Sequence, residues 1–306
     1  MGKLNIKDKT REEWLALRGE GVGGSDAATC LDLNPWKSKY SLFLEKTGKL
    51  VPEDISAKPV VEWGNRLEDV ILEKFKDNHP EFFKVEKPEH MYFNDDYPYL
   101  RANLDGLCYK GDEVEGLEIK TTSVSNAEKW KDGSVPINYT LQCMHYMLVC
   151  PEIKRFHIAV LIGGSEYREI TIDRDEEIIA TLLQAELTFW THVLTGTPPS
   201  LDGTASTQKA LNSLYPSSNG TEIYLDEQSE VAANYESLNI ACKETEDSLK
   251  ELIAKRDAFK SILINALGSN ERAVVGDYVV SYKTTHRKES YTKPTSFRRF
   301  TFKKIR

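Results

Sequence analysis

The chain has 306 residues, of which 40% are hydrophobic and 29% charged, as in ordinary globular proteins. No run approaches the roughly 20 apolar residues of a membrane helix, and the first ten residues lack the apolar core of a signal peptide. We therefore expect a cytoplasmic protein without a membrane partner. Five scattered cysteines without a C-x-x-C pair argue against a disulfide framework, a zinc site or an iron–sulfur cluster.

The formal net charge of −8 speaks against a nucleic-acid partner, because attraction to phosphates normally supplies much of the affinity for DNA. The charge is unevenly distributed, however. Residues 281–306 contain nine Lys or Arg and one Glu, a net charge of +8, which leaves −16 on the first 280 residues. The value for the whole chain therefore hides a basic C-terminal segment.

Short helices are predicted near the N-terminus. Thr10 and Glu13 have the spacing of a capping box, which opens a helix that ends at Gly19. The glycine-rich residues 21–26 are unsuited to regular structure but lead into a second helix, and residues 40–47 form a third. These helices would hold the glycine-rich turn in place.

The middle of the chain alternates between helical and extended patterns. From residue 62 to 76, apolar residues recur every three or four positions, which predicts an amphipathic helix with Glu68 at the edge of its apolar stripe. Residues 100–105 and 117–120 alternate between apolar and polar side chains. We expect two strands paired through a hairpin loop at residues 110–116.

Four further elements complete an α/β domain that covers residues 1–200. They are a helix at 138–149, strands at 155–162 and 167–172, and a helix at 175–195. Residues 201–224 are rich in Pro, Ser, Asn and Gly and are expected to form a linker.

The remaining residues, 225–306, are expected to form a second structured part. Apolar residues follow a 4-3 spacing from Val231 to Ala266, which predicts a long, coiled-coil-like helix for oligomerisation or packing. A small, basic β extension follows. Its aromatic side chains among cations favour gripping of DNA, but a small β subdomain with Lys-rich edges explains them as well: Tyr282, Tyr291, Phe297, Phe300 and Phe302.

Three ionisable residues carry the chemistry. The period of two in a strand places Glu118 and Lys120 on one face, while Asp105 ends the strand predicted to pair with it. Neighbouring carboxylates repel unless they share a hard cation, for which Mg²⁺, with Mn²⁺ as a substitute, suits oxygen ligands. The lysine would then polarise the attacking water or stabilise charge on a phosphate. A solvated, charged strand is the plain alternative for this fragment alone.

The motifs taken together resemble the lambda-exonuclease/YqaJ viral recombinase family of PD-(D/E)xK nucleases, over residues 11–195. One departure is Leu104, which stands where the nuclease motif has proline. The motifs that carry the resemblance are L-R-x6-S-D-A (17–27), N-P-W (34–36), W-G-N-R-L-E (63–68), D-G-L (105–107), L-E-I-K (117–120) and L-Q-C-M-H-Y (141–146).

The resemblance implies a fold and a metal site. The fold is a restriction-endonuclease-like core, a mixed central sheet flanked by helices, followed here by the long helix and the basic β extension. Asp105 and Glu118 are implied as metal ligands together with the backbone carbonyl of Ile119, and Lys120 as the residue that orients water. Glu68 is implied as the helix carboxylate that binds a second metal or its water; its alternative is a solvated glutamate.

Three further residues take roles from the resemblance. Gln142 is implied to position water or the scissile phosphate, although a buried helix also accommodates a satisfied glutamine. Arg18 and Ser25 are implied to bind a terminal 5′-phosphate, which suits the bidentate guanidinium and the glycine-rich turn. Alternatively, Arg18 simply ends one helix and Ser25 caps the next.

The function implied by the resemblance is a Mg²⁺-dependent 5′-to-3′ exonuclease on linear double-stranded DNA. It would act on DNA ends, leave 3′ single-stranded overhangs for a single-strand annealing protein, and form a homotrimeric ring. The source would be a phage or prophage in a bacterial cytosol. Two alternatives remain: a structure- or sequence-specific endonuclease of the same fold, and a non-catalytic DNA-end-binding scaffold.

Overall fold

The computed structural model describes residues 1–286 and 296–304, which divide into two compact units, Met1–Asn219 and Gly220–Arg306. In the first unit, the helices are α1 (Arg11–Gly19), α2 (Gly24–Cys30), α3 (Lys39–Lys46), α4 (Pro59–Asn78), the 3₁₀ helix η1 (Val124–Gly133), α5 (Ile137–Val149), α6 (Glu176–Thr195) and α7 (Ala205–Leu214). The strands are β1 (Gly2–Asn5), β2 (Val22–Gly23), β3 (Lys84–Glu86), β4 (His90–Phe93), β5 (Leu100–Ala102), β6 (Gly106–Lys110), β7 (Glu113–Thr122), β8 (Arg155–Ile162) and β9 (Glu166–Asp173).

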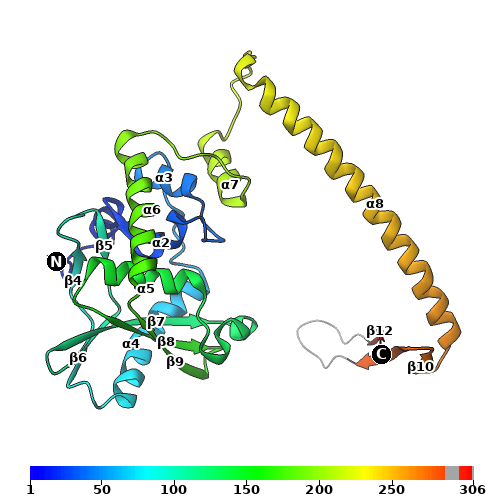
Figure 1. Cartoon of the computed structure of the whole chain (residues 1–306), viewed down its shortest axis with the longest axis horizontal. Coiled ribbons are helices and arrows are strands. Elements are labelled where there is room, and N and C mark those ends of the chain that lie inside the picture. Colours follow the sequence, from blue (N-terminus) through cyan, green and yellow to red (C-terminus); the bar gives the residue numbers. More distant parts are fainter. Residues whose placement is uncertain (287–295, 305–306) are drawn as a thin grey trace. The chain divides into compact units, whose positions relative to one another are not determined.

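The strands of this unit form two sheets (Figure 1). The four-stranded sheet has the order β1-β4-β5-β2, and the five-stranded sheet has the order β3-β6-β7-β8-β9. In the five-stranded sheet only β7 and β8 run parallel, and the other neighbours are antiparallel. The predicted fold class, a mixed sheet flanked by helices, is therefore confirmed.

Helices α4 and α5 lie on opposite faces of the five-stranded sheet (Figure 1). Alternate residues of β7 point to opposite faces, so Leu117 and Ile119 pack with Phe75 of α4 in one core cluster. The intervening Glu118 faces α5, where the Gln142 side chain contacts it. A single strand thus supplies core residues on one side and polar site residues on the other.

One predicted pairing is wrong. Residues 100–105 do not form a single strand paired with 117–120: β5 ends at Ala102 and belongs to the four-stranded sheet, whereas β6 pairs with β7. Asp105 therefore precedes β6, in the short crossing between the two sheets. Alternation of side chains cannot reveal such a crossing, because buried and partly exposed residues continue to alternate from Leu100 to Gly106, through the crossing itself. The hairpin loop is also shorter than expected, with Lys110 already paired to Glu113 and Gly111 at a φ of 61°.

Part of the segment expected to be a linker is folded. Helix α7 occupies residues 205–214, and its Thr207 is buried, with its hydroxyl 2.8 Å from the Ser38 hydroxyl at the start of α3. The Ser38 N–H also donates to the Ser206 hydroxyl at 3.0 Å. The polar composition hid this helix because its attachment relies on hydroxyl groups more than on a broad apolar face.

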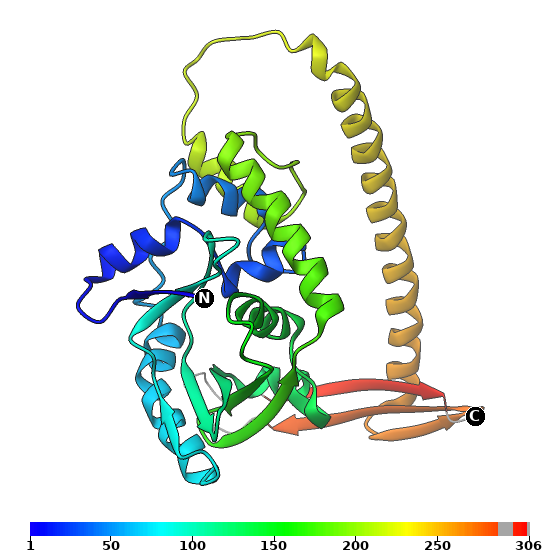
Figure 2. The same cartoon turned by 60° about the vertical axis from the view of Figure 1, so that its left-hand side comes forward.

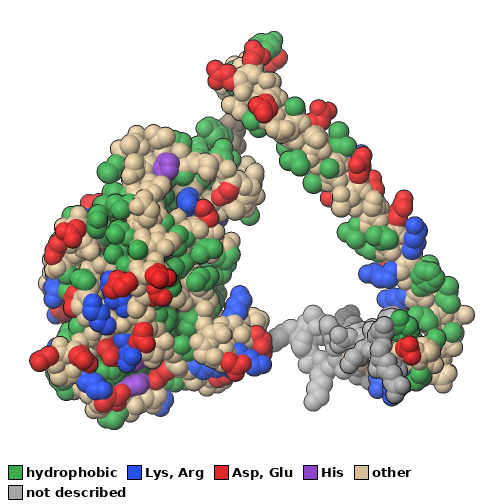
Figure 3. All heavy atoms as spheres, viewed as in Figure 1, with side chains coloured by type: hydrophobic (Ala, Val, Ile, Leu, Met, Phe, Trp, Pro, Cys, Tyr) green, Lys and Arg blue, Asp and Glu red, His purple; other side chains and the backbone are tan. Residues whose placement is uncertain are grey.

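The second unit contains a single long helix followed by strands (Figure 2). Helix α8 (Ser229–Leu267) follows the short η2 (Asp226–Gln228), and strands β10 (Arg272–Val275), β11 (Tyr278–His286) and β12 (Ser296–Lys304) form an antiparallel sheet. The predicted helix and β extension are thus present. Apolar side chains such as Leu238 and Leu252 are exposed along α8 among acidic ones (Figure 3).

Two expectations for this unit stay predictions. The first is that the coiled-coil-like seam of α8 packs against a partner helix. The basic side chains proposed to grip DNA lie mostly beyond Thr285, outside the side chains that the structure describes. Across the described part of the chain, no helix combines the length and apolar composition needed to cross a membrane.

Candidate active site

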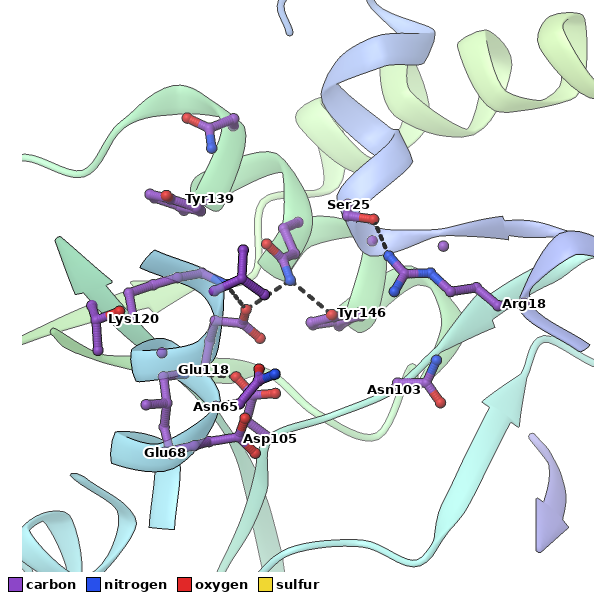
Figure 4. A pocket seen from close by; sticks show the side chains of 18 of the residues that line it. Arg18, Ser25, Asn65, Glu68, Asn103, Asp105, Glu118, Lys120, Tyr139 and Tyr146 are labelled. Atoms are coloured by element: carbon purple, nitrogen blue, oxygen red, sulfur yellow. Dashed lines mark hydrogen bonds and ion pairs between the residues drawn. The ribbon is translucent and has the colours of Figure 1, made fainter. Parts of the chain in front are cut away.

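A cavity of about 570 Å³ in the first unit brings all the predicted site residues together (Figure 4). Glu68, Asp105, Glu118 and Lys120 gather in one part of it, whereas Arg18 and Ser25 lie in another (Figure 4). The predicted residues in its lining are Arg18, Ser25, Glu68, Asp105, Glu118, Ile119, Lys120 and Gln142. They come from α1, α2, α4, β7, α5 and the crossing before β6.

Glu118 is the centre of a hydrogen-bonded group. Its side chain is only 1% exposed, and its Oε1 accepts from the Lys120 ammonium group and, at 2.7 Å, from the Gln142 amide. The same amide donates to the Tyr146 hydroxyl at 2.8 Å. Glu118 and Lys120 therefore share a face of β7 as predicted, and Gln142 is held between two partners.

Asp105 is fixed to the neighbouring strand by the backbone. Its Oδ2 accepts from the Ile119 N–H at 2.9 Å, which holds the carboxylate beside Glu118. Burial, and then the Glu118 charge, raise the pKa of Asp105 to about 8. Burial likewise raises the pKa of Glu118. For Lys120, burial would lower the pKa, but the charges of Glu118 and Asp105 outweigh it and raise the pKa above its ordinary value.

These residues fit a hard cation. Glu118 Oε2 is buried and has no hydrogen-bond partner, so one carboxylate oxygen is available beside Asp105. An unpartnered buried carboxylate oxygen is costly unless a cation or water satisfies it. In the described part of the chain, no three His, Cys, Asp or Glu side chains are close enough to hold a metal alone. A metal here would bind Asp105 and Glu118, with the Ile119 carbonyl implied by the resemblance.

Glu68 stands in the same cavity but has a partner that the sequence did not reveal. Its carboxylate forms an ion pair at 2.5 Å with the ammonium group of Lys87, a residue in the loop between β3 and β4. Burial would lower the pKa of Lys87, but the hydrogen bond and charge of Glu68 raise it. Lys87 lies 19 residues from Glu68 along the chain and in none of the quoted motifs, so no sequence signal marked it.

Arg18 and Ser25 form the other part of the cavity. The Arg18 guanidinium donates to the Ser25 hydroxyl and lies over the Trp14 ring, 5.2 Å from its centroid. Ser25 does not cap α2, because the N-cap residue is Gly23. The helix-capping explanation for Ser25 is therefore wrong, whereas Arg18 does lie in the last turn of α1.

Asn103 was also missed by the sequence interpretation. It lines the cavity two residues before Asp105, and its Oδ1 is buried without a hydrogen-bond partner. Its place in the crossing between the sheets, directly after Ala102 at the end of β5, puts a polar amide on the cavity wall. Only its position beside the predicted Asp105 could have drawn attention to it.

Gly24 is the residue on which Gln142 and Tyr146 pack. A Cβ added to it would lie 2.5 Å from the Tyr146 ring and 3.0 Å from Gln142 Cγ. We expect Gly24→Ala to lower the free energy of unfolding by about 1–3 kcal/mol and to displace the Gln142 side chain, because the buried ring cannot yield freely. Urea unfolding would measure the loss. Gly19→Ala is the control, because its Cβ meets no atom within 4 Å; equal stability of the two variants would contradict the packing argument.

The fold and the cavity define a class: a mixed α/β protein with a buried carboxylate–lysine group on a sheet and an arginine–serine pair in the same pocket. Residues 13–152 match the YqaJ-like viral recombinase domain family. The chain is also 32% identical over 318 residues to the uncharacterized protein YqaJ of Bacillus subtilis strain 168, covering 97% of this chain and 96% of that protein. The chain therefore belongs to the YqaJ-like viral recombinase family.

A solved structure shows the same fold. The alkaline exonuclease LHK-Exo from Laribacter hongkongensis superposes with a TM-score of 0.50 at 19% sequence identity, covering 60% of this chain and 93% of that one. At this identity the similarity establishes the fold alone. The share of this chain outside the superposition is 40%, so the match does not extend over the whole chain.

Proposed function

We propose that this protein is a Mg²⁺-dependent 5′-to-3′ exonuclease that degrades one strand of linear double-stranded DNA and leaves 3′ overhangs. The observation that carries the proposal is that one cavity contains both the Glu68–Asp105–Glu118–Lys120 group and the Arg18–Ser25 pair. Membership of the viral recombinase family supports it, as does the fold shared with a protein named as an alkaline exonuclease.

Each part of the cavity has a task in this reaction. Arg18, held over Trp14, would bind the terminal 5′-phosphate together with the Ser25 hydroxyl. Lys120 would orient the attacking water or stabilise charge on the scissile phosphate. Gln142 would position the water or the scissile phosphate. Mg²⁺ bound to Asp105 and Glu118 would supply Lewis acidity toward the phosphate. Fixing the 5′-phosphate at a set distance from Lys120 restricts cleavage to DNA ends.

The test uses the purified chain with linear duplex DNA and with covalently closed circular duplex, each with Mg²⁺ or with a chelator. We expect mononucleotide release from linear duplex with Mg²⁺ but not with the chelator. Closed circular duplex should release no nucleotides in either condition, because it has no 5′ end to bind. Nicking of the circles would instead identify an endonuclease. DNA binding without any metal-dependent release of nucleotides would identify a scaffold.

Arg18→Ala tests the 5′-phosphate pocket. We expect the wild-type protein to prefer a 5′-phosphate over a 5′-hydroxyl end, and the variant to lose about 10- to 100-fold of this preference, since a charge-assisted bond to phosphate disappears. Arg11→Ala is the matched control, because Arg11 lies on the same helix, pairs with Asp54 and does not line the cavity. Rates on the two end types would be compared by gel assay. An unchanged preference in Arg18→Ala would remove Arg18 from this role.

The assembly and the setting follow from the family resemblance. We propose a ring-shaped homotrimer that admits duplex, Mn²⁺ as a substitute cation, a single-strand annealing protein as partner, and a phage or prophage source in the bacterial cytosol. Light scattering of the purified chain would give the number of subunits. Capture of the annealing protein on the immobilised chain would test the partner.

A further inference from the structure

Trp36 is an exposed aromatic side chain at the edge of the active-site cavity. It is 69% exposed, and it lines the active-site cavity together with a second cavity of about 380 Å³. We call this second space the Trp36 cavity. Its lining includes Trp36, Thr122, Lys129, Asn138 and Tyr139.

The backbone turn that presents Trp36 is held in place. The Asn34 side chain accepts from the Trp36 N–H at 2.9 Å, and its amide donates to the Thr29 hydroxyl at 2.9 Å. Thr29 is fully buried in α2, the helix that also carries Ser25. The indole therefore stands on a backbone turn that is hydrogen-bonded to the buried helix α2, so this turn needs little ordering before a ligand can stack on the ring.

The two cavities are neighbours that share lining residues near Lys120. Trp36, Asn138 and Tyr139 line both, and Thr122 of the Trp36 cavity follows Lys120 by two residues on β7. The Tyr139 ring lies under the Lys120 ammonium group, 5.0 Å from centroid to Nζ. Arg18 and Ser25 line only the active-site cavity. The Trp36 cavity thus adjoins the Lys120 end.

We propose that the Trp36 cavity is a nucleobase subsite, in which the Trp36 indole stacks on a base of the cleaved strand on the 3′ side of the scissile phosphate. This inference rests on the proposed function. A strand with its 5′-phosphate on Arg18 and its scissile phosphate beside Lys120 would reach this adjoining cavity with its next nucleotides. Stacking on an aromatic ring tolerates any base, and an exonuclease that proceeds through arbitrary sequence requires such tolerance. Lys129 adds a positive charge for the backbone phosphate.

Binding is measured separately from cleavage, in the full-length chain carrying Glu118→Gln. The probe is 5′-phosphorylated duplex with 2-aminopurine at successive positions from the 5′ end. We expect its fluorescence to be quenched at one of the positions next to the terminal nucleotide. Adding Trp36→Ala should abolish the quenching and weaken binding about 5- to 150-fold, whereas Trp36→Phe should largely retain both.

Trp63→Ala is the control, because Trp63 is also an exposed tryptophan, at 59%, but lines neither cavity. The subsite would be overturned if adding Trp36→Ala left the quenching and the affinity of the Glu118→Gln chain unchanged, or if Trp63→Ala reduced both as much as Trp36→Ala. This holds even where the wild-type chain degrades DNA. If quenching depends on Trp36 but the wild-type chain releases no nucleotides, the subsite stands and the proposed function fails. Absence of DNA binding by the Glu118→Gln chain would overturn the subsite.

Discussion

Replacing Glu118 by Gln is expected to slow metal-dependent DNA hydrolysis by about 10³-fold or more while leaving the protein folded. Gln has nearly the same shape but lacks the charge of the carboxylate that contacts both Lys120 and Gln142. Its amide would also place a donor where Glu118 Oε2, buried and unpartnered, offers an acceptor for a cation. The rate of nucleotide release from linear duplex at saturating Mg²⁺ measures the effect.

The control for this variant is on the same strand. Glu115 also lies on β7, but it does not line the active-site cavity. Its carboxylate pairs with the His157 ring at 2.5 Å. Glu115→Gln should therefore retain nearly full activity. Circular dichroism of both variants checks the fold, and calorimetric titration with Mg²⁺ should show weakened binding for Glu118→Gln alone. Unaltered hydrolysis by Glu118→Gln would dismiss the carboxylate group as the active site.

Local sequence patterns were enough to predict most elements that surround this site. The predicted capping box at Thr10 and Glu13 is confirmed by reciprocal hydrogen bonds, and the strand predicted at 155–162 is confirmed with the same bounds. The face shared by Glu118 and Lys120 is confirmed as well. Such features depend on residues close together in the chain, where periodicity and capping preferences act directly.

Features that depend on distant residues were not accessible in this way. The four-stranded sheet pairs β1 with β4 across about 90 residues, and short strands such as β2 carry no periodic pattern of their own. The Lys87–Glu68 ion pair and the Asp105–Ile119 hydrogen bond likewise appear only once the sheets are assembled. The motifs therefore named residues that line one cavity, but not the contacts that hold them.

The buried Asp105 predicts a conflict between stability and function. Because its pKa in the folded, metal-free protein is about 8 instead of the ordinary 3.8, the folded state binds a proton more tightly than the unfolded state. The free energy of unfolding should therefore fall as the pH rises from about 4 to about 8. Under the proposed function, the same carboxylate, once ionised, is what a divalent cation would bind, so the stability lost at higher pH would be the cost of that function.

Asp105→Asn should remove this cost and abolish hydrolysis at the same time. Relative to wild type, we expect the metal-free variant to gain stability by about 1 kcal/mol for each pH unit between pH 5 and pH 8, measured by urea unfolding. Added Mg²⁺ should then raise the melting temperature of the wild-type protein at pH 8 but not that of the variant. Asp8→Asn, an exposed aspartate near the N-terminus, should show neither change. A stability difference independent of pH would mean that Asp105 is ionised throughout, because a group with the same charge in both states contributes no pH dependence.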